Sequence, residues 1–439
     1  MNFFTINNYT KNILRNNKYN DLKNIYSQYV NHYITSEDAY IVKAFPMPFL
    51  FPEKKYKDII KNFDLVFSAQ LKILGHLLRE KSKKEILKKL SVPENLNSLI
   101  DWENILDKKR YHGRIDFLLS KNGYKFCEFN IESAFGGSEL FNIADIFNKI
   151  FGLKLSNTKN YLSPYNVLAK NLSKVCYLNN IKKIVILVGD DNHKQGYFKF
   201  NDLERYISLQ SQGIEVVKKS ISEIKEFDRN TLFYRLFMDE EIPCNSQILQ
   251  TLKEKGCIII NLFDCYVLSS KKWFALLHEE KYFHLISKEE KKAIKNYIPF
   301  TSTLSEKKLM ECLKNKDKYV FKHSVSYGGK LVLVGKELEA NKIIEVIKKK
   351  FSDWIVQDYF ETDSINFPEN LDGDYKKYNL VFGIFFSMQN YSGVLVRGSI
   401  NKKVVNLTSG SSKIGWGIVL NKKEMNSLKL QIAKEEICE

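Results

Sequence analysis

The sequence predicts a mixed fold, α+β with an α/β part, and three features lead to that prediction. Apolar residues at helical spacing dominate the first hundred residues, strand-type runs alternate with a helix from about residue 182, and strands fill the C-terminal part. The chain has 439 residues, of which 44% are hydrophobic, with only 8 Pro and 20 Gly. It is therefore expected to be ordered and to comprise two or three structural units.

The net charge indicates which classes of binding partner have to be considered. The 68 basic and 51 acidic residues give +17, a surplus that could suit nucleic acid or an anionic membrane. The lysines are scattered among abundant Asn and Ile, so we attribute the surplus to overall composition and expect no nucleic-acid partner. We expect no membrane partner either, because no apolar run approaches the roughly 20 residues of a membrane span and the N-terminus lacks the apolar region of a signal peptide.

Cysteine and histidine usage indicates the compartment and argues against zinc. The seven cysteines form an odd set without a CxxC pair and lie mostly in apolar, strand-like contexts. Such residues are typical of reduced core thiols, which predicts a cytoplasmic protein. The seven histidines show no metal-ligand spacing, so we expect no zinc site.

Residues 1–104 are predicted to form a mainly helical N-terminal region. Apolar residues recur every three or four positions in 59–78 and 86–90. The Pro-containing segment 45–52 interrupts this pattern and is expected to be extended. We expect this region to pack against the rest of the chain and find no chemistry in it.

A β-hairpin with polar residues on one face is predicted at about 110–130. Arg114 and Asp116 lie on its first strand, a turn follows at 121–123, and Glu128 and Asn130 share a face of the second strand. Two carboxylates and an amide oxygen are ligands that Mg²⁺ prefers, and Arg114 can donate to an oxyanion. Alternating acids on a strand are more often a solvated face. Cys127 is expected to point away from the acids.

The segment after the hairpin is expected to turn at Gly136 and Gly137 and then to form a helix over 138–151 with Ser138 as its cap. From residue 182 a small α/β unit is predicted, with strands at 184–189, 214–217 and 231–236 and a helix at 202–212. Its parallel strands would bind ligands at their carboxyl ends. A strand at 257–261 is expected to follow it.

Two later segments each carry a lysine in a distinctive setting. Lys272 follows a Ser-Ser-Lys run at an expected helix start, and the apolar run 273–277 continues from it, so the family resemblance given below favours Lys272 over Lys271. Lys322 lies on a strand that leads into a loop with Ser326, Gly328 and Gly329, followed by another apolar strand. A lysine binds phosphate as a point charge, and glycines let backbone N–H groups approach oxyanions.

Two strands toward the C-terminus carry the remaining candidates. Gln357 lies in a buried-type strand at 354–360, where many structural residues would fit as well. Arg397 ends the apolar run 394–396, and an arginine there is costly to bury without an anionic partner. That partner could be a structural carboxylate or a phosphate. Further strands are expected at 380–387, 393–399 and 404–407, with a polar loop at 408–412.

Arg-x-Asp followed by Glu-x-Asn, with the Glu twelve residues after the Asp, resembles the metal-binding segment of the circularly permuted ATP-grasp ligases, the glutathionylspermidine synthase type. The resemblance covers about residues 105–420. It implies an ATP-grasp catalytic region at 105–165 and 251–439, and a small α/β pre-ATP-grasp domain at 166–250 on the substrate side. The early position of Glu-x-Asn, ahead of the nucleotide-type segments, is what suggests the permutation.

The resemblance also implies an enzymatic function and roles for individual residues. The chain would be an ATP-dependent carboxylate-amine ligase that acts through an acyl phosphate and releases ADP and phosphate, with small-molecule or peptide carboxylates and amines as substrates. ATP would contact the Lys272, Lys322 and Gln357 segments, Mg²⁺ would be held by the acids and Asn130, and the two arginines would be catalytic.

Two alternatives stay open. One is an ATP-grasp relative that binds nucleotide without catalysis, against which the intact set of two acids and an amide argues. The other is a basic polyanion-binding protein, for which clustered basic and aromatic residues would be expected and are not seen.

Overall fold

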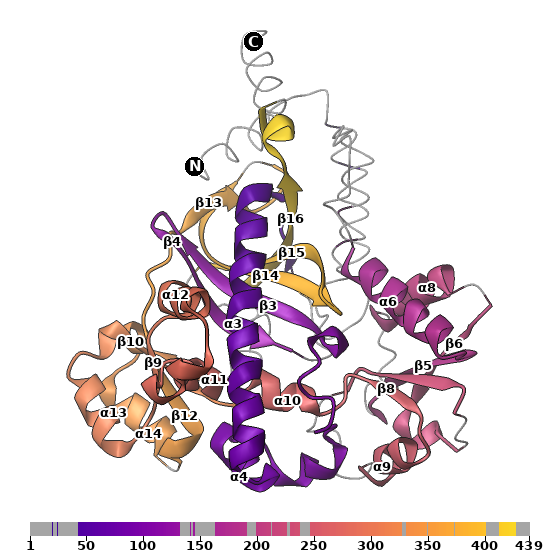
Figure 1. Ribbon diagram of the computed structural model, residues 1–439. Helices are drawn as coiled ribbons and strands as arrows, with labels where there is room; N and C mark the ends of the chain where they lie inside the picture. Colours follow the sequence, from indigo (N-terminus) through magenta and orange to yellow (C-terminus); the bar gives the residue numbers. More distant parts are fainter. Residues whose placement is uncertain are drawn as a thin grey trace.

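A computed structural model describes most of the chain between residues 43 and 426. The described residues are 20, 24, 43–131, 141, 144, 163–190, 199–211, 213–225, 229–237, 246–326, 331–348, 350–372, 374–400 and 412–426. The expected turn at Gly136 and Gly137, most of the helix expected over 138–151, the strand at 404–407 and nearly all of the loop at 408–412 lie outside them. Three sheets with their covering helices make up the fold (Figure 1).

The largest sheet has eight strands drawn from both ends of the chain. Its main path runs β1-β16-β15-β14-β3-β4, and β2 pairs with β16 while β13 pairs with β14. The strands are β1 Lys43–Ala44, β2 Phe49–Pro52, β3 His112–Ser120, β4 Gly123–Asn130, β13 Ile365–Pro368, β14 Tyr375–Ser387, β15 Asn390–Ser399 and β16 Ser412–Leu420. The extended segment expected at 45–52 thus adds strands to this sheet, parallel to the late strand β16.

Two tight hairpins set the order of the central strands. In β3–β4 the predicted hairpin is present, but its turn has two residues instead of the expected 121–123, because Gly123 already pairs with Ser120. In β14–β15, Ser387 pairs with Asn390, and both turn residues, Met388 and Gln389, have positive φ angles of 47° and 65°. Two consecutive positive φ values match the right-handed twist of the flanking strands.

The long helix α3, Glu53–Glu80, lies across the eight-stranded sheet (Figure 1). Its apolar residues recur every three or four positions, and most of its buried residues are among them; Asn62 and Gln70 are buried as well. Phe63 packs its ring against those of Phe129, Phe386 and Phe126, with centroids 5.1, 5.5 and 6.3 Å apart. This apolar face of the sheet leaves the opposite face of β3 and β4 for the polar residues.

The second sheet is parallel and has the order β6-β5-β7-β8. It comprises β5 Lys183–Val188, β6 Glu215–Ser220, β7 Thr231–Arg235 and β8 Ile258–Ile260, with helices α6 Pro164–Leu178, α8 Lys199–Gln210 and α9 Ser246–Glu254. The predicted strand-helix-strand unit is therefore present. Its last strand, β8, lies beyond the expected boundary at residue 250 and pairs with β7.

The third sheet, of order β11-β10-β12-β9, is antiparallel and has a small apolar core of its own. Its strands are β9 Thr301–Thr303, β10 Tyr319–His323, β11 Val332–Val334 and β12 Trp354–Asp358, and its helices are α13 Glu306–Leu313 and α14 Ala340–Ile347. Phe321 and Ile343 are fully buried in this core.

Short helices complete the described part. These are α4 Lys83–Leu90, α10 Asp264–Ser269, α11 Lys272–Leu276 and α12 Lys288–Tyr297, with 3-10 turns at Glu94–Leu99, Lys108–Arg110, Ile221–Glu223, Glu280–Leu285, Lys316–Lys318, Gly335–Glu337 and Phe351–Asp353. The helix start expected at Ser269 lies at the end of α10, and Ser270 and Lys271 separate α10 from α11. Among the described residues, none of the helices combines the length and apolar character needed to cross a bilayer.

Candidate active site

The β3–β4 hairpin places the two predicted acids directly opposite each other. Asp116 pairs with Glu128 in the strand register, and Arg114 pairs with Asn130. The hairpin therefore brings these four residues together, as their spacing predicted. Opposed side chains on one face of an antiparallel pair lie within reach of one another.

Asp116 is fully buried and is the centre of a charge cluster. Arg114 donates to it through Nε (2.6 Å to Oδ1) and Nη2 (3.1 Å to Oδ2). Arg397, which reaches over from β15, donates from Nη2 at 2.6 Å, and Asn130 donates from Nδ2 at 2.9 Å, both to Oδ2. Burial alone would raise the pKa of Asp116, but the two guanidinium groups together hold that pKa below its usual value.

Gly383 on β14 makes room for this cluster. It is the neighbour of Asp116 in the sheet register. A Cβ at this position would lie 2.6 Å from Cδ of Arg114 and 2.9 Å from Oδ1 of Asp116. Only a residue without a side chain lets the arginine lie flat across the sheet, so Gly383 is part of the site, and no motif in the sequence marked it.

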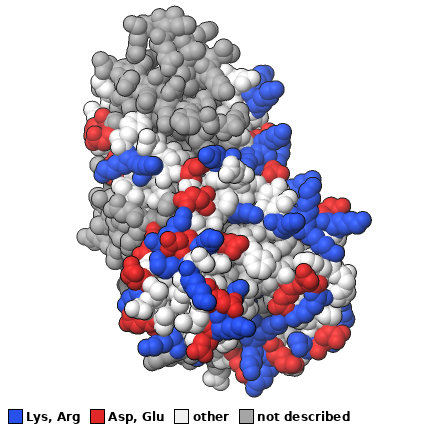
Figure 2. All heavy atoms as spheres, turned by 90° about the vertical axis from the view of Figure 1, so that its left-hand side faces the viewer, with Lys and Arg blue, Asp and Glu red and all other residues white. Residues whose placement is uncertain are grey.

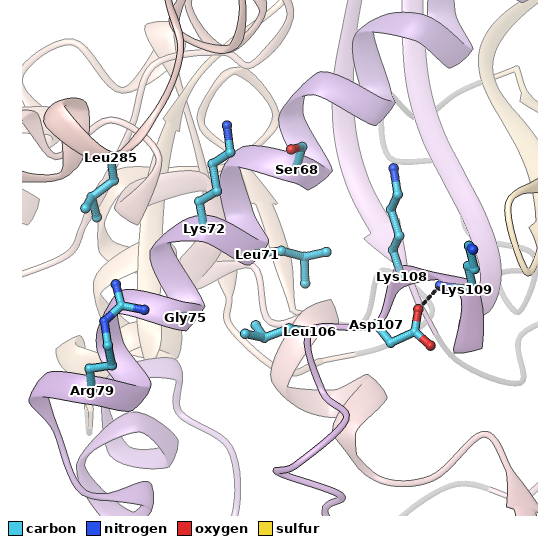
Figure 3. A pocket seen from close by; sticks show the side chains of 10 residues that line it. All are labelled: Ser68, Leu71, Lys72, Gly75, Arg79, Leu106, Asp107, Lys108, Lys109 and Leu285. Carbon is cyan, nitrogen blue, oxygen red and sulfur yellow. Dashed lines mark hydrogen bonds between the residues drawn. The ribbon is translucent and has the colours of Figure 1, made fainter.

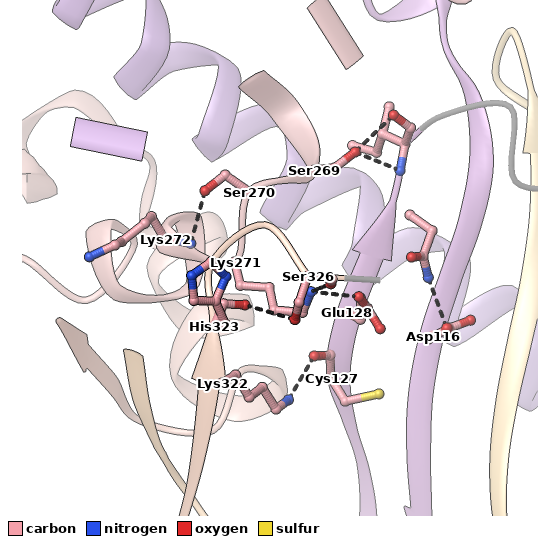
Figure 4. Close-up of polar contacts among 12 residues, drawn as sticks. Asp116, Cys127, Glu128, Ser269, Ser270, Lys271, Lys272, Lys322, His323 and Ser326 are labelled. Carbon is pink, nitrogen blue, oxygen red and sulfur yellow. Dashed lines mark hydrogen bonds and ion pairs between the residues drawn. The ribbon is translucent and has the colours of Figure 1, made fainter. Parts of the chain in front are cut away.

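A β-bulge changes the expected position of Cys127. The register shifts between Asp116 and Phe117, because Phe117 pairs with Phe126 and leaves Cys127 as the extra residue of β4. The prediction that Cys127 points away from the acids is wrong. Its side chain projects from β4 on the same side as Glu128 (Figure 4), and the charges of Lys322, Asp116 and Glu128 all act on the thiol. Burial raises its pKa to about 12, so it stays a neutral thiol.

Glu128 pairs with Lys271, the lysine that the sequence analysis did not choose. Lys271 Nζ lies 2.9 Å from Glu128 Oε1 and donates to the backbone carbonyl of Ser326 at 2.6 Å (Figure 4). Its backbone N–H also donates to the carbonyl of Ser324 at 3.0 Å. Lys271 therefore holds the segment 324–326 over Glu128, and we call this set of contacts the Lys271 latch.

Lys272 points elsewhere, and its ammonium group donates to the backbone carbonyl of Ser352. Burial lowers its pKa to about 8, although the nearby Asp353 acts in the opposite direction. The structure therefore does not bring Lys272 to the acids. The sequence could not separate the two lysines, because the apolar helix register follows both and only the break between α10 and α11 turns them apart.

Lys322 and Gln357 meet on the third sheet. Lys322 Nζ donates to Oε1 of Gln357 at 2.8 Å and to the backbone carbonyl of Cys127 at 3.0 Å, so it connects β10 to the large sheet. Nε2 of Gln357 in turn donates to Oγ1 of Thr301 at 3.0 Å. Burial lowers the pKa of Lys322, and the Glu128 charge partly offsets this. Thr301 is a further member of the site that sequence reasoning missed.

Three predicted site residues belong to the segment next to the Lys271 latch or to the loop that follows it. Ser326 contributes its backbone carbonyl, while Gly328 and Gly329 lie outside the described residues. A cavity of about 10 Å³ lies between Glu128, Asn130, Lys271 and Ser324. Such a volume holds about one water molecule. A nucleotide therefore requires the latch to open.

The oxygen atoms of the site are suited to a metal ion only when that ion is bound to an anion such as phosphate. Asp116, Glu128 and Asn130 offer the oxygen ligands of a magnesium site. Within the described residues, however, no three His, Cys, Asp or Glu side chains form a metal-type group. Three cations form ion pairs with the two carboxylates, and the charge of Lys322 acts on Glu128 without a direct contact, so the cluster itself is positive. The buried Nε–H of Arg397 has no acceptor in the described part of the chain. The cluster is therefore suited to a metal ion that arrives with a phosphate group. Asp116, Glu128 and Asn130 would hold that ion.

Two solved structures align with most of this chain. A glutathione synthetase-like effector from Globodera pallida, in its apo form, aligns with a TM-score of 0.57 and 12% identity over 91% of this chain and 96% of that chain. A candidate gamma-glutamylcysteine synthetase from Methylobacillus flagellatus KT aligns with a TM-score of 0.40 and 12% identity over 76% of this chain and 86% of that chain.

Neither a scan against protein-family models nor a search of curated protein sequences finds a match. The circular permutation and the glutathionylspermidine synthase type stay predictions. The similarity to the effector concerns the fold alone: this chain has the mixed α/β fold of that glutathione synthetase-like effector.

Proposed function

We propose that this protein is an ATP-dependent ligase that joins a carboxylate to an amine and releases ADP and phosphate. One observation carries the proposal: four cationic side chains from four separate segments converge on the Asp116–Glu128 pair. Their charges exceed those of the two acids, which makes the site suitable for a polyanion such as a triphosphate. The glutathione synthetase-like fold supports a ligase of this type.

The chemistry has two steps. The terminal phosphoryl group of ATP passes to a carboxylate oxygen of the substrate, which gives an acyl phosphate and ADP. The amine nitrogen then attacks the acyl carbon, the bond from that carbon to the phosphate oxygen breaks, and phosphate leaves as the amine loses a proton. Neither step needs a covalent bond to the protein, and both need charge stabilisation and positioning.

Two arginines of the large sheet can stabilise negative charge on the oxygens that react. Arg114 and Arg397 are held in place by Asp116, so their remaining N–H groups have a set direction. The free Nε–H of Arg397 can donate to an oxygen of the transferred phosphoryl group. Mg²⁺, when bound with ATP, would neutralise and orient the phosphates.

The residues around the third sheet suit the nucleotide. Lys322 would donate to a phosphate oxygen, and Gln357, which fixes its ammonium group, borders the same space. Lys271 would exchange the carboxylate of Glu128 for phosphate oxygens when the latch opens. In this proposal Lys271 takes the part that the sequence analysis gave to Lys272.

We also propose the permuted, glutathionylspermidine synthase-type arrangement, with small-molecule or peptide substrates. Strand order supports it: the β3–β4 hairpin with the acids precedes the third sheet in the chain, whereas β14 and β15, its neighbours in the large sheet, follow that sheet.

The test has a binding part and a turnover part. MgATP should raise the melting temperature of the folded protein in a concentration-dependent way, since ligand at 100 times its dissociation constant adds about 2.7 kcal/mol of stability. Mg²⁺ without nucleotide should have little effect, because the site is positive when empty. A melting temperature that does not change when MgATP is added would contradict the proposal.

Glu128→Gln tests turnover. ADP release in the presence of pooled amino acids, polyamines and short peptides should fall by orders of magnitude, since each 1.36 kcal/mol of lost transition-state stabilisation is about tenfold in rate. Glu361→Gln is a matched control, because Glu361 forms an exposed ion pair with Lys336 away from the cluster. Near-normal ADP release by Glu128→Gln would remove this residue from the site.

A nucleotide-binding protein without catalysis is the second candidate. The burial of Asp116 among two arginines favours it, because the carboxylate must give up a buried ion pair before it can hold a metal. This candidate predicts MgATP stabilisation without substrate-dependent ADP release.

The polyanion-binding alternative receives no support from the surface in Figure 2. Acidic side chains are interspersed among the basic ones over that face, so the net charge of +17 does not gather there into one continuous basic surface. The location of the protein in the cell stays a prediction.

A further inference from the structure

A groove of about 670 Å³ lies beside α3, away from the charge cluster (Figure 3). One wall is α3, and the others are the turn at 106–109 and Leu285 at the end of a 3-10 helix. Its size falls within the range of small-ligand and peptide-anchor pockets. Nothing in the proposed ligase chemistry uses it.

The floor of the groove is apolar. Leu71, Leu106 and Leu285 line it together with Gly75, a buried glycine inside the long helix. A Cβ at Gly75 would lie 3.3 Å from Cδ1 of Leu106, so the glycine lets the turn approach the helix closely. Leu106 is nevertheless 42% exposed, one of the large apolar side chains that the described residues leave open to solvent.

The rim of the groove is cationic. Arg79, Lys108 and Lys109 are exposed, and in the part of the chain that the structure describes none of them forms an ion pair; we call them the rim cations. Lys72 also lines the groove, but Glu290 neutralises it at 2.8 Å. Asp107 is the acid of the lining. Its Oδ1 accepts the backbone N–H of Lys109 at 3.0 Å, which caps the short 3-10 turn.

The wall that carries Leu106 and two of the rim cations is held rigidly. Tyr111 donates its hydroxyl to the carbonyl of Ile105 at 2.6 Å, and Ile105 is fully buried. An ion pair of 2.7 Å between Arg110 and Asp101 fastens the same turn. The groove is therefore formed before any partner binds, which lowers the entropic cost of binding.

We propose that this groove binds an acidic peptide segment, with one apolar side chain seated on the leucines and carboxylates placed against the rim cations. An apolar floor inside a charged rim is the arrangement of protein recognition sites. The excess of positive charge, about two after Asp107 and Glu290 are counted against the four cations, selects an acidic partner. A free phosphate or nucleotide would use the rim and leave the leucines without a partner.

The experiment is a fluorescence-anisotropy titration with a labelled peptide in which one Leu is flanked by two Glu on each side. Two control peptides replace every Glu by Gln, or the Leu by Ser. The intact protein should bind the first peptide most tightly, and added salt should weaken that binding.

Two pairs of substitutions separate the rim from the general positive charge. Arg79→Gln with Lys108→Gln should weaken binding roughly 2- to 30-fold, the range for two lost surface charge pairs. Lys54→Gln with Lys61→Gln removes the same charge from exposed positions of α3 that do not line the groove, and it should leave binding unchanged. Equal weakening by both pairs would overturn the proposal, because it would indicate unspecific attraction.

Leu106→Ser tests the floor. This variant should bind the Leu and Ser peptides equally, whereas the intact protein distinguishes them. If the intact protein also fails to distinguish them, or if only ATP and inorganic phosphate bind with sensitivity to the rim substitutions, the site is a small-anion site and the peptide proposal is wrong.

Discussion

The two acids of the candidate site differ in how they are held. The Asp116 side chain is 1% exposed and is bound by residues of the large sheet alone, on β3, β4 and β15. The Glu128 side chain is 25% exposed, and its partner Lys271 lies between two short helices and also holds the 324–326 segment. One half of the site is therefore held within the large sheet, which we call the fixed half, and the other half joins the large sheet to the third sheet, which we call the movable half because we propose that it opens for a ligand.

This difference teaches which measurement should respond to which substitution. When a buried ion cluster loses one member, the remaining charges are no longer compensated. Removing one member should therefore lower the free energy of unfolding. The Glu128–Lys271 pair joins a buried lysine to a carboxylate that is partly exposed, so solvent or a ligand can reach the carboxylate side of the pair. Substitutions in the fixed half should thus change unfolding, and substitutions in the movable half should change ligand binding.

The largest expected effect is that of Asp116→Asn. It keeps the shape and leaves Arg114 and Arg397 buried with their main counter-charge removed. The free energy of unfolding, measured in urea, should fall by about 3–5 kcal/mol. Glu128→Gln should lower it less, because the Glu128 side chain is partly exposed and the new amide oxygen can still accept a hydrogen bond from Lys271. Equal losses in the two variants would break the distinction between a fixed and a movable half.

Lys322→Met should lower nucleotide affinity. The methionine keeps most of the stem, while the charge-assisted contact to phosphate, worth roughly 1.5–3 kcal/mol, is lost. ATP affinity measured by calorimetry should therefore fall about 10- to 150-fold. The unfolding free energy should fall by about 1–3 kcal/mol, because Gln357 Oε1 and the Cys127 carbonyl lose their donor. Lys318→Met, at an exposed position just before the same strand, is the control. Unchanged ATP affinity in Lys322→Met would remove this lysine from the site.

Gly383→Ala should disturb the fixed half through contact alone. The added methyl group meets the Arg114 side chain and forces it to shift, at a cost of about 1–3 kcal/mol in unfolding free energy. In a double-mutant cycle with Arg114→Ala, the two losses should not add, since the alanine removes the obstructed side chain. Additive losses would mean that the glycine is needed for another reason.

The pH dependence of stability should report on Lys272. Burial lowers its pKa in the folded protein to about 8, against an ordinary value of 10.5. Between these pH values the unfolded chain binds more protons, so stability should rise with pH across that window. Lys272→Met should flatten the rise in urea titrations at pH 7 to 10, whereas Lys318→Met should not. A rise of the same slope in Lys272→Met would show that this lysine is not desolvated.

The smallest expected effect is that of Thr301→Val. The variant keeps the volume and leaves Nε2 of Gln357 without its hydroxyl acceptor, a loss of about 1 kcal/mol. ATP affinity should fall a few-fold, because Gln357 then orients the Lys322 ammonium group less well. Thr303→Val, on the exposed end of the same strand, is the control. An unchanged affinity would limit Thr301 to a structural part.

Much of the large sheet could be predicted from the sequence, because its signals are local. The turn after Ser120 set the register of the β3–β4 hairpin, and the period of two placed Glu128 and Asn130 with Asp116. The helical period of α3 and the apolar runs of β5 and β7 likewise depend on neighbours a few residues away.

Other parts depended on contacts between distant segments. The bulge at Cys127 moved this residue to the polar side, and a register shift has no signature in strand alternation. The pairing of β1 and β2 with β16 joins the two ends of the chain, and β8 joined the parallel sheet although it lies after the expected boundary.

Local patterns were enough to predict the mixed fold class, the hairpin and the placement of the two acids and their amide neighbour on it. The packing of distant segments brings Lys271 rather than Lys272 to Glu128 and places Gly383 and Thr301 beside the candidate site residues. The physical reason is distance along the chain: periodicity records which face a residue takes, whereas the partner across a sheet or between two sheets is fixed by packing.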